Sequence, residues 1–133
     1  MQALTSLFRP ASVAIIGASG KPGKIGNIIL KNVVASGYPG RVFPINPKET
    51  EIEGLPAYPS VTRVPEAVEV AVIAVPAPRV LPVVAECGAV GVKHLIVISA
   101  GFKETGAEGN ALEKELVSTA RRYGMRVVGP NCV

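Results

Sequence analysis

Short runs of Val, Ile and Ala recur along the chain and alternate with longer segments in which apolar and charged residues are mixed. The runs do not alternate apolar with polar positions, which is typical of parallel strands covered on both faces. Strands that alternate with helices predict an α/β layer fold. We predict five strands, at Val13–Gly17, Arg41–Asn46, Val68–Val75, His94–Ala100 and Met125–Gly129.

The segments between these runs predict helical connections. The first begins at Lys24, and Gly37 is placed to end it. Its apolar residues recur at helical spacing: Ile25, Ile28, Ile29 and Val33. A short second helix is expected at Pro65–Val68, because proline suits the first helical position.

Two further helices precede the last two strands. The third helix begins at Pro78, although Pro82 permits a helix only if it lies within the first turn. The fourth runs from Gly109 to Gly124 and gathers its apolar residues on one face: Leu112, Leu116, Val117 and Ala120. With right-handed crossovers, the five strands predict a single α/β domain over residues 1–133, a Rossmann-like, doubly wound, mainly parallel sheet.

A doubly wound sheet binds ligands outside the carboxyl ends of its strands. The segments that directly follow the predicted strands should therefore lie along one crevice. These segments are GASGKPG, NPK, PAP, SAGFKE and GPNC.

The segment GASGKPGKIG, Gly17–Gly26, has the composition of a phosphate-binding loop. Glycines let the backbone approach a phosphate, and the helix that follows offers free N–H groups and the positive end of its dipole. Ser19 adds a hydroxyl, and Lys21 and Lys24 add charge. The spacing Gly-x-x-Gly-x-x-Gly departs from the dinucleotide fingerprint Gly-x-Gly-x-x-Gly. A tight strand-to-helix turn that binds nothing is the alternative interpretation.

The end of the second strand discriminates between nucleotides. An NAD site places an acid about 20 residues beyond the glycines, where it holds the ribose hydroxyls. Here that place holds Asn46, followed by Pro47 and Lys48. A lysine suits an additional ribose phosphate, which NADP and coenzyme A both carry, and a solvated loop charge is the alternative. A shift of register would be needed to bring one of the next acids to the strand end: Glu49, Glu51 or Glu53.

Composition excludes several classes of function. The net charge of +4 comes without a run of basic residues and without tryptophan, so no nucleic-acid interface is expected. One histidine, two cysteines and no aspartate do not predict a metal site. No segment has the length and apolarity of a signal peptide or membrane helix, and there is no disulfide framework. We therefore expect a cytoplasmic protein.

Residues for catalysis are hard to find. No tyrosine is followed four residues later by lysine, so the Tyr/Lys pair of short-chain dehydrogenases is missing. His94 begins a strand, at the edge away from the crevice, and is expected to be structural. Cys87 is expected in the core, whereas Cys132 either lies close to a bound ligand or fills a small buried site. No catalytic residue is assigned.

Five motifs occur in order along the chain: LFRPASVAIIGASGKPGKIG, VFPINPKETEIEGLPAYPSV, VAVIAVPAP, ISAGFKETG and VVGPNC. Together they resemble the N-terminal CoA-binding domain of ADP-forming acyl-CoA synthetases. These enzymes include the ADP-forming acetate–CoA ligases and are related to the α subunit of succinyl-CoA synthetase. The resemblance extends from Leu7 to Cys132.

The resemblance implies coenzyme A, or an acyl-CoA, as the ligand and assigns its contacts. The family's glycine-rich loop holds the CoA phosphates, here with Gly17, Ala18, Ser19, Gly20, Lys21 and Pro22, beside Lys24. The adenosine borders Asn46, Pro47 and Lys48. Two turns line the nucleotide and pantetheine path: Val75, Pro76, Ala77 and Pro78, and Ser99, Ala100, Gly101 and Phe102. Near the thiol lie Asn131 and Cys132.

The resemblance also implies partners. The family reaction passes a phosphoryl group from an acyl phosphate to a histidine and then to ADP, and His94 does not occupy that histidine's motif. The phosphohistidine and the ATP-grasp domain would lie outside this chain, so we expect a fragment, an excised domain or a shortened relative that binds CoA without turnover. A stand-alone CoA-binding regulatory module and an NADP-dependent oxidoreductase or redox sensor stay open as alternatives. Self-association through apolar surfaces, as a homo-oligomer, also stays open.

Overall fold

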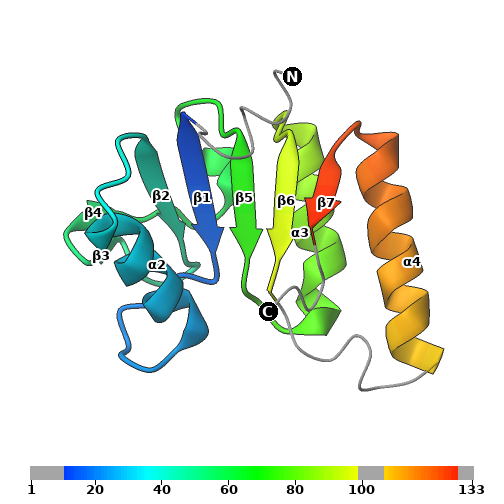
Figure 1. Ribbon diagram of the computed structural model, residues 1–133, viewed down its shortest axis with the longest axis horizontal. Coiled ribbons are helices and arrows are strands. Elements are labelled where there is room, and N and C mark those ends of the chain that lie inside the picture. Colours follow the sequence, from blue (N-terminus) through cyan, green and yellow to red (C-terminus); the bar gives the residue numbers. More distant parts are fainter. Residues whose placement is uncertain (1–10, 99–106, 129–133) are drawn as a thin grey trace.

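A five-stranded parallel sheet forms the centre of the computed structural model, which describes residues 11–98 and 107–128 (Figure 1). Its strands are β1 (Ser12–Ile16), β2 (Arg41–Ile45), β5 (Val70–Ile73), β6 (His94–Val97) and β7 (Arg126–Val128). They pair in the order β2-β1-β5-β6-β7, and every pair is parallel. The predicted α/β, doubly wound sheet is confirmed.

Helices cover both faces of the sheet. α2 (Ile25–Ala35) lies on one face, and α3 (Ala77–Ala89) and α4 (Ala107–Arg122) lie on the other (Figure 1). Successive side chains of a strand point to opposite faces, so Ile15 packs in the cluster of α2 and Ile16 in that of α3. Within the described residues, no helix is both long and apolar enough to cross a membrane.

The buried face of α2 differs from the one that its apolar spacing suggests. Gly26 and Leu30 are buried, whereas Ile25 and Ile28 are 49 % and 44 % exposed. A Cβ at Gly26 would lie 1.9 Å from the carbonyl oxygen of Gly17. The helix therefore approaches the preceding loop on its glycine side, and this close contact sets its rotation.

The prediction of a helix at Pro65–Val68 is wrong. The only helical turn in this connection is η1, a 3-10 turn at Val61–Arg63. Ser60 supplies the N-cap, because its hydroxyl accepts a hydrogen bond from the Thr62 backbone N–H. Proline at a permitted position is a weaker signal than a serine that satisfies a backbone donor.

A small antiparallel hairpin was not predicted. It consists of β3 (Glu51–Ile52) and β4 (Leu55–Pro56), joined at Glu53 and Gly54, which both have positive φ. Strands this short carry no periodic pattern, so hydrophobicity alone does not reveal them.

α3 continues through Pro82, which lies well past the first turn, contrary to the expected restriction. Pro82 is exposed, while Val80, Val84 and Cys87 are fully buried against the sheet. The packing of this face outweighs the backbone hydrogen bond that proline removes. Cys87 lies in the core, as predicted, and burial raises the pKa of its thiol to about 12.

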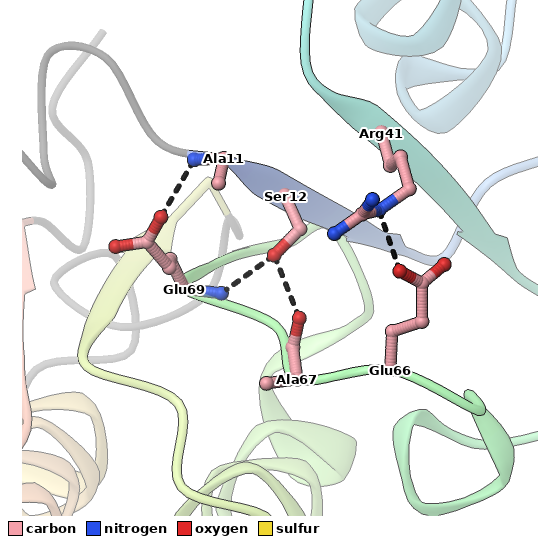
Figure 2. A network of polar contacts seen from close by, with 6 residues as sticks. All are labelled: Ala11, Ser12, Arg41, Glu66, Ala67 and Glu69. Carbon is pink, nitrogen blue, oxygen red and sulfur yellow. Dashed lines mark hydrogen bonds and ion pairs between the residues drawn. The ribbon is translucent and has the colours of Figure 1, made fainter.

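Polar groups satisfy one another at the amino ends of the strands (Figure 2). Ser12 Oγ donates to the Ala67 carbonyl at 2.8 Å and accepts from the Glu69 backbone N–H at 3.1 Å. The Glu69 carboxylate in turn accepts from the Ala11 N–H at 2.6 Å. This network joins the start of β1 to the segment that leads into β5.

Two further residues lie at this amino edge. Arg41 Nε forms an ion pair with Glu66 at 2.7 Å, shown beside the network in Figure 2. His94 begins β6 and is 3 % exposed. It lies at the edge opposite the predicted crevice, which agrees with the structural role expected for it.

Candidate functional site

A cavity of about 660 Å³ opens at the carboxyl ends of β1, β2 and β5. Ile16 and Ile45, the last residues of β1 and β2, line it together with Ala74, which follows β5. Small-molecule sites typically have volumes of about 300–1,000 Å³. The cavity lies where the doubly wound topology predicts a ligand crevice.

The cavity has two ends, one on each face of the sheet. The loop end, beside α2, is lined by Ser19, Lys21, Lys24, Ile25 and Gly26. The α3 end, beside η1 and α3, is lined by Pro59, Ser60, Val61, Arg79, Val83 and Glu86. Residues that follow β2 and β5 lie between these ends: Asn46, Pro47, Lys48, Glu49, Val75 and Pro76.

Two glycines of the loop are required by close packing. Gly17 has φ +94°, and a Cβ there would lie 2.4 Å from the Ala74 carbonyl oxygen. Gly26 allows α2 to contact the Gly17 backbone, as described above. Glycine at these two positions allows the loop to pack against the end of β5 and against α2. Packing therefore explains Gly17 and Gly26, and phosphate binding is needed to explain only the other glycines of the loop.

The N-terminus of α2 is flanked by cations, and the carboxylate of Glu53 contacts its first turn through the Asn27 side chain, at 3.1 Å, and not through a cap. Lys24 is the N-cap residue, its side chain makes no capping hydrogen bond, and the first turn contains no acid. Lys21 and Lys24 are both exposed and line the cavity. Positive side chains at the positive end of a helix dipole are unfavourable. An anion bound there would be stabilised by the lysine charges and by the helix dipole.

Asn46 joins the end of β2 to the glycine-rich loop. Its Nδ2 donates to the Ala18 carbonyl at 2.9 Å and to Glu49 Oε2 at 3.2 Å. Its Oδ1 accepts from the backbone N–H groups of Lys48 at 2.7 Å and Glu49 at 3.0 Å. The chain therefore turns back directly after β2.

This turn brings Glu49 to the loop without a shift of register. Glu49 Oε2 accepts a hydrogen bond from the Gly20 backbone N–H at 3.2 Å. Glu49 therefore reaches the loop from beyond the end of β2, and the expectation that an acid on the strand end itself would need a shift of register is not tested by this contact. In the sequence, Asn46 is notable only because it occupies the position where an NAD site has an acid. In the structure, Asn46 stabilises the turn that places Glu49 beside the loop.

Four cations surround the cavity: Lys21, Lys24, Lys48 and Arg79. All four are exposed, and none forms an ion pair with any residue that the structure describes. The only carboxylates among the lining residues are those of Glu49 and Glu86. The lining is thus suited to an anionic ligand that carries several charges.

Most of the predicted site residues within the described ranges line this cavity: Gly17, Ala18, Ser19, Lys21, Lys24, Asn46, Pro47, Lys48, Val75 and Pro76. Gly20 takes part through its N–H to Glu49. Ala77 is the first residue of α3. The remaining predicted residues lie outside the described ranges: Ser99, Ala100, Gly101, Phe102, Asn131 and Cys132.

Of the predicted residues in the described ranges, Gly20, Pro22 and Pro78 do not line the cavity. Pro22 and Pro78 are both exposed. In α3 the helical period places Arg79, Val83 and Glu86 on the cavity face, and Pro78 is turned away from that face. For Pro22, the loop directs Lys21 rather than the proline toward the cavity.

Sequence reasoning missed several lining residues. Ser60 belongs to the AYPSV segment and Arg79 directly follows the PAP segment, so both had a positional signal that was not used. Glu86 lies in the middle of a helix, and nothing in the local sequence marks it. Only the folded structure places Glu86 at the cavity, where Ser60 Oγ donates to Glu86 Oε1 at 2.6 Å.

Comparisons with known proteins give a consistent result. The model of one family, described as the CoA binding domain, matches residues 11–133. Acetate–CoA ligase [ADP-forming] I subunit alpha of Pyrococcus furiosus is 53 % identical over 132 residues, which are 96 % of this chain and 29 % of the relative. Acetate–CoA ligase [ADP-forming] I of Archaeoglobus fulgidus is 54 % identical over 127 residues, 96 % of this chain and 18 % of the relative. The chain therefore spans less than a third of the length of these relatives.

Solved structures agree with the sequence matches. The dinucleotide forming acetyl-coenzyme A synthetase 1 of Ca. Korarchaeum cryptofilum, in complex with phosphate and ADP, has a TM-score of 0.93 and 51 % identity. The match covers 98 % of this chain and 28 % of that one. A shorter hypothetical protein from Pyrococcus horikoshii OT3 has a TM-score of 0.75 and 27 % identity, with 96 % of this chain and 81 % of that one covered.

Proposed function

Since the chain belongs to the CoA binding domain family, we propose that it is the CoA-binding portion of an ADP-forming acyl-CoA synthetase. Its relatives of the acetate–CoA ligase type support this assignment. In this role the domain holds CoA and presents the thiol to an activated acyl group. The phosphohistidine and ATP-grasp domains would supply the remaining steps from outside this chain.

The observation that carries the proposal is the N-terminus of α2. Lys21 and Lys24 lie there with neither a side-chain cap nor an acid in the first turn. This arrangement is unfavourable in the free protein and becomes favourable when a phosphate binds. We therefore propose that the loop end of the cavity holds the diphosphate of CoA.

Glu49 occupies one donor of this proposed phosphate site. A phosphate that binds the Gly20 N–H would replace the Glu49 carboxylate, while Asn46 still holds the loop through the Ala18 carbonyl. We expect Glu49→Gln to tighten CoA binding by about threefold to tenfold, because a neutral amide competes less well with phosphate. Glu51→Gln is the matched control, since Glu51 is exposed and does not line the cavity.

Lys48 is proposed to bind the phosphate on the ribose of CoA. It is exposed, lines the cavity and directly follows the Asn46 turn. Lys48→Gln should weaken CoA more than dephospho-CoA, whereas Lys31→Gln on the exposed surface of α2 should change neither. An equal loss for both ligands would show that Lys48 does not contact this phosphate.

Calorimetric titration with CoA, dephospho-CoA, NADP and NAD tests the proposal as a whole. We expect saturable binding of CoA and weaker binding of dephospho-CoA. Tighter binding of NADP would overturn the ligand and favour an oxidoreductase or redox sensor. The chain alone should bind CoA without forming acetyl-CoA from acetate, ATP and CoA, whereas a full-length ADP-forming acetate–CoA ligase, assayed separately as a positive control, should form it.

A second candidate function is a stand-alone CoA-binding module. The observation that favours it is the short chain from Pyrococcus horikoshii OT3, most of whose length has the same fold. Titration of this chain and of the similar subunit alpha from Pyrococcus furiosus with CoA separates the two functions. Equal CoA affinity in both proteins would favour the module, and a marked gain in the longer subunit would favour the synthetase portion.

A further inference from the structure

We propose that Glu86 recognises the 6-amino group of the adenine base of CoA at the α3 end of the cavity. The inference rests on the proposed function, because it takes the CoA diphosphate to lie at the loop end. Glu86 would then be a residue that determines base specificity.

The path of the chain separates the α3 end from the phosphate loop. The segment at Tyr58 runs beside the end of β2, since Asn46 N–H donates to its carbonyl at 2.9 Å and Tyr58 N–H donates to the Pro44 carbonyl at 3.0 Å. β2 is an edge strand, and its other neighbour is β1. Tyr58 and Val61 pack in the cluster of α3, on the sheet face opposite α2, so Pro59 and Ser60 meet α3 on that face.

The α3 end has the character of a base pocket. Pro59, Val61, Pro76 and Val83 give it apolar walls, and Val61 is 2 % exposed. Flat aromatic rings bind in such surroundings, with a few polar groups that fix their orientation. Glu86 supplies a carboxylate at this end of the cavity.

Ser60 positions the Glu86 carboxylate. Ser60 Oγ donates to Glu86 Oε1 at 2.6 Å. Ser60 Oγ also accepts a hydrogen bond from the Thr62 N–H at 3.2 Å. Glu86 is half-buried, and no donor among the described residues bonds its Oε2. An ionised carboxylate only accepts hydrogen bonds, so it selects a ligand group that carries N–H or O–H donors.

The parts of CoA differ in what they offer this carboxylate. The phosphates are repelled by it, whereas the 6-amino group of adenine donates two N–H bonds from a flat apolar ring. The pantetheine amides also donate, but the thiol end is expected beyond β6 and β7, away from η1 and α3. The adenine amino group is therefore the ligand donor that suits Glu86.

A chemical double-mutant cycle tests the proposal. The wild-type chain and Glu86→Met are titrated with CoA and with a CoA analogue that carries hydrogen in place of the 6-amino group. We expect the wild-type chain to prefer CoA by about tenfold and Glu86→Met to lose this preference. Glu113→Met, at a half-buried glutamate of α4 outside the cavity, should keep it.

A second variant guards against effects on folding. Ser60→Ala leaves the carboxylate but removes its positioning donor, so the preference should fall without disappearing. Thermal unfolding of each variant defines the temperature at which all are folded. Adenosine 3′,5′-bisphosphate, which lacks pantetheine, should show the same dependence on Glu86 as CoA does.

The outcomes are distinct. Equal weakening of both ligands by Glu86→Met would assign Glu86 a structural role and overturn the inference. Weaker binding of CoA by Glu86→Met, with unchanged binding of adenosine 3′,5′-bisphosphate, would move the contact to pantetheine and also overturn the inference. If the wild-type chain binds no CoA, the proposed function itself fails, whereas CoA binding without a base preference defeats only the inference about Glu86.

Discussion

Ser12 begins β1 and Gly17 follows its end, and the two ends of this single strand have opposite surroundings. At the amino edge, Ser12 is 1 % exposed and bonds both the Ala67 carbonyl and the Glu69 N–H. At the carboxyl edge, Lys21 and Lys24 are exposed beside an uncapped helix N-terminus. The amino edge consists of polar groups that satisfy one another, whereas the carboxyl edge adds, beside the bonds of Asn46, lysines without ion-pair partners among the described residues.

The difference teaches where stability and binding reside in the same sheet. Hydrogen bonds that are complete and buried stabilise the native state. Charges without partners contribute little to stability, or oppose it, until a ligand arrives. Substitution of Ser12 should therefore lower stability and leave binding unchanged, whereas substitution of Lys21 and Lys24 should weaken binding without lowering stability.

The largest effect is expected where the carboxyl edge is tied to the scaffold. Gly26→Ala places a methyl group against the Gly17 carbonyl oxygen and should lower the free energy of unfolding by more than about 2 kcal/mol. Gly23→Ala is the control, because a Cβ there meets nothing within 4 Å and only the positive φ opposes it, at a cost of about 1 kcal/mol. Urea unfolding measures both, and equal losses would contradict the importance of this close contact.

At the amino edge, Ser12→Ala leaves the carbonyl of Ala67 and the N–H of Glu69 without their part-buried bonds to Ser12. We expect a loss of about 1–3 kcal/mol in the free energy of unfolding, with CoA affinity unchanged. Ser36→Ala, which removes an exposed bond at the end of α2, should cost less. A change in CoA affinity for Ser12→Ala would contradict the idea that the amino edge contributes to stability but not to binding.

The converse test is the double variant Lys21→Gln with Lys24→Gln. CoA should bind at least about tenfold more weakly, because two charge-assisted contacts are lost. Without ligand, the free energy of unfolding should stay constant or rise by up to about 1 kcal/mol, since two unfavourable charges leave the helix N-terminus. Calorimetry and thermal unfolding of the same sample give both quantities, and a fall in stability would mean that the lysines hold the free fold together.

The smallest effect is expected for Arg41→Gln. The side chains of Arg41 and Glu66 are 61 % and 39 % exposed, so solvent screens their ion pair. Exposed pairs contribute about 0–1 kcal/mol, and added salt should reduce the difference from wild type further. A larger, salt-independent loss would place this pair inside the buried network instead of beside it.

Strands and the main helices could be predicted because their signals are local. Continuous Val and Ile runs gave β1 and β5, and Gly37 and Gly124 follow their helices with positive φ, as expected for helix ends. The glycine-rich loop also came from local composition. The rotation of α2 did not, because it depends on the contact between Gly26 and Gly17.

The polar part of the site was predictable only in part. Lys21, Lys24 and Lys48 follow strands directly, so topology alone places them at the crevice. Glu49 reaches Gly20, and Glu86 reaches Ser60, across segments that lie far apart in the sequence. Such contacts depend on how elements pack, which no single-segment pattern contains.

The burial of Cys87 has a consequence for chemical labelling of this protein. With a thiol pKa of about 12, almost none of Cys87 is present at neutral pH as the thiolate that alkylating agents and oxidants attack. Alkylation of Cys87 at neutral pH should therefore be slow in the folded chain and should follow its unfolding, because unfolding returns this thiol to water. The rate of labelling at Cys87 would then measure how often the core of the α3 face opens.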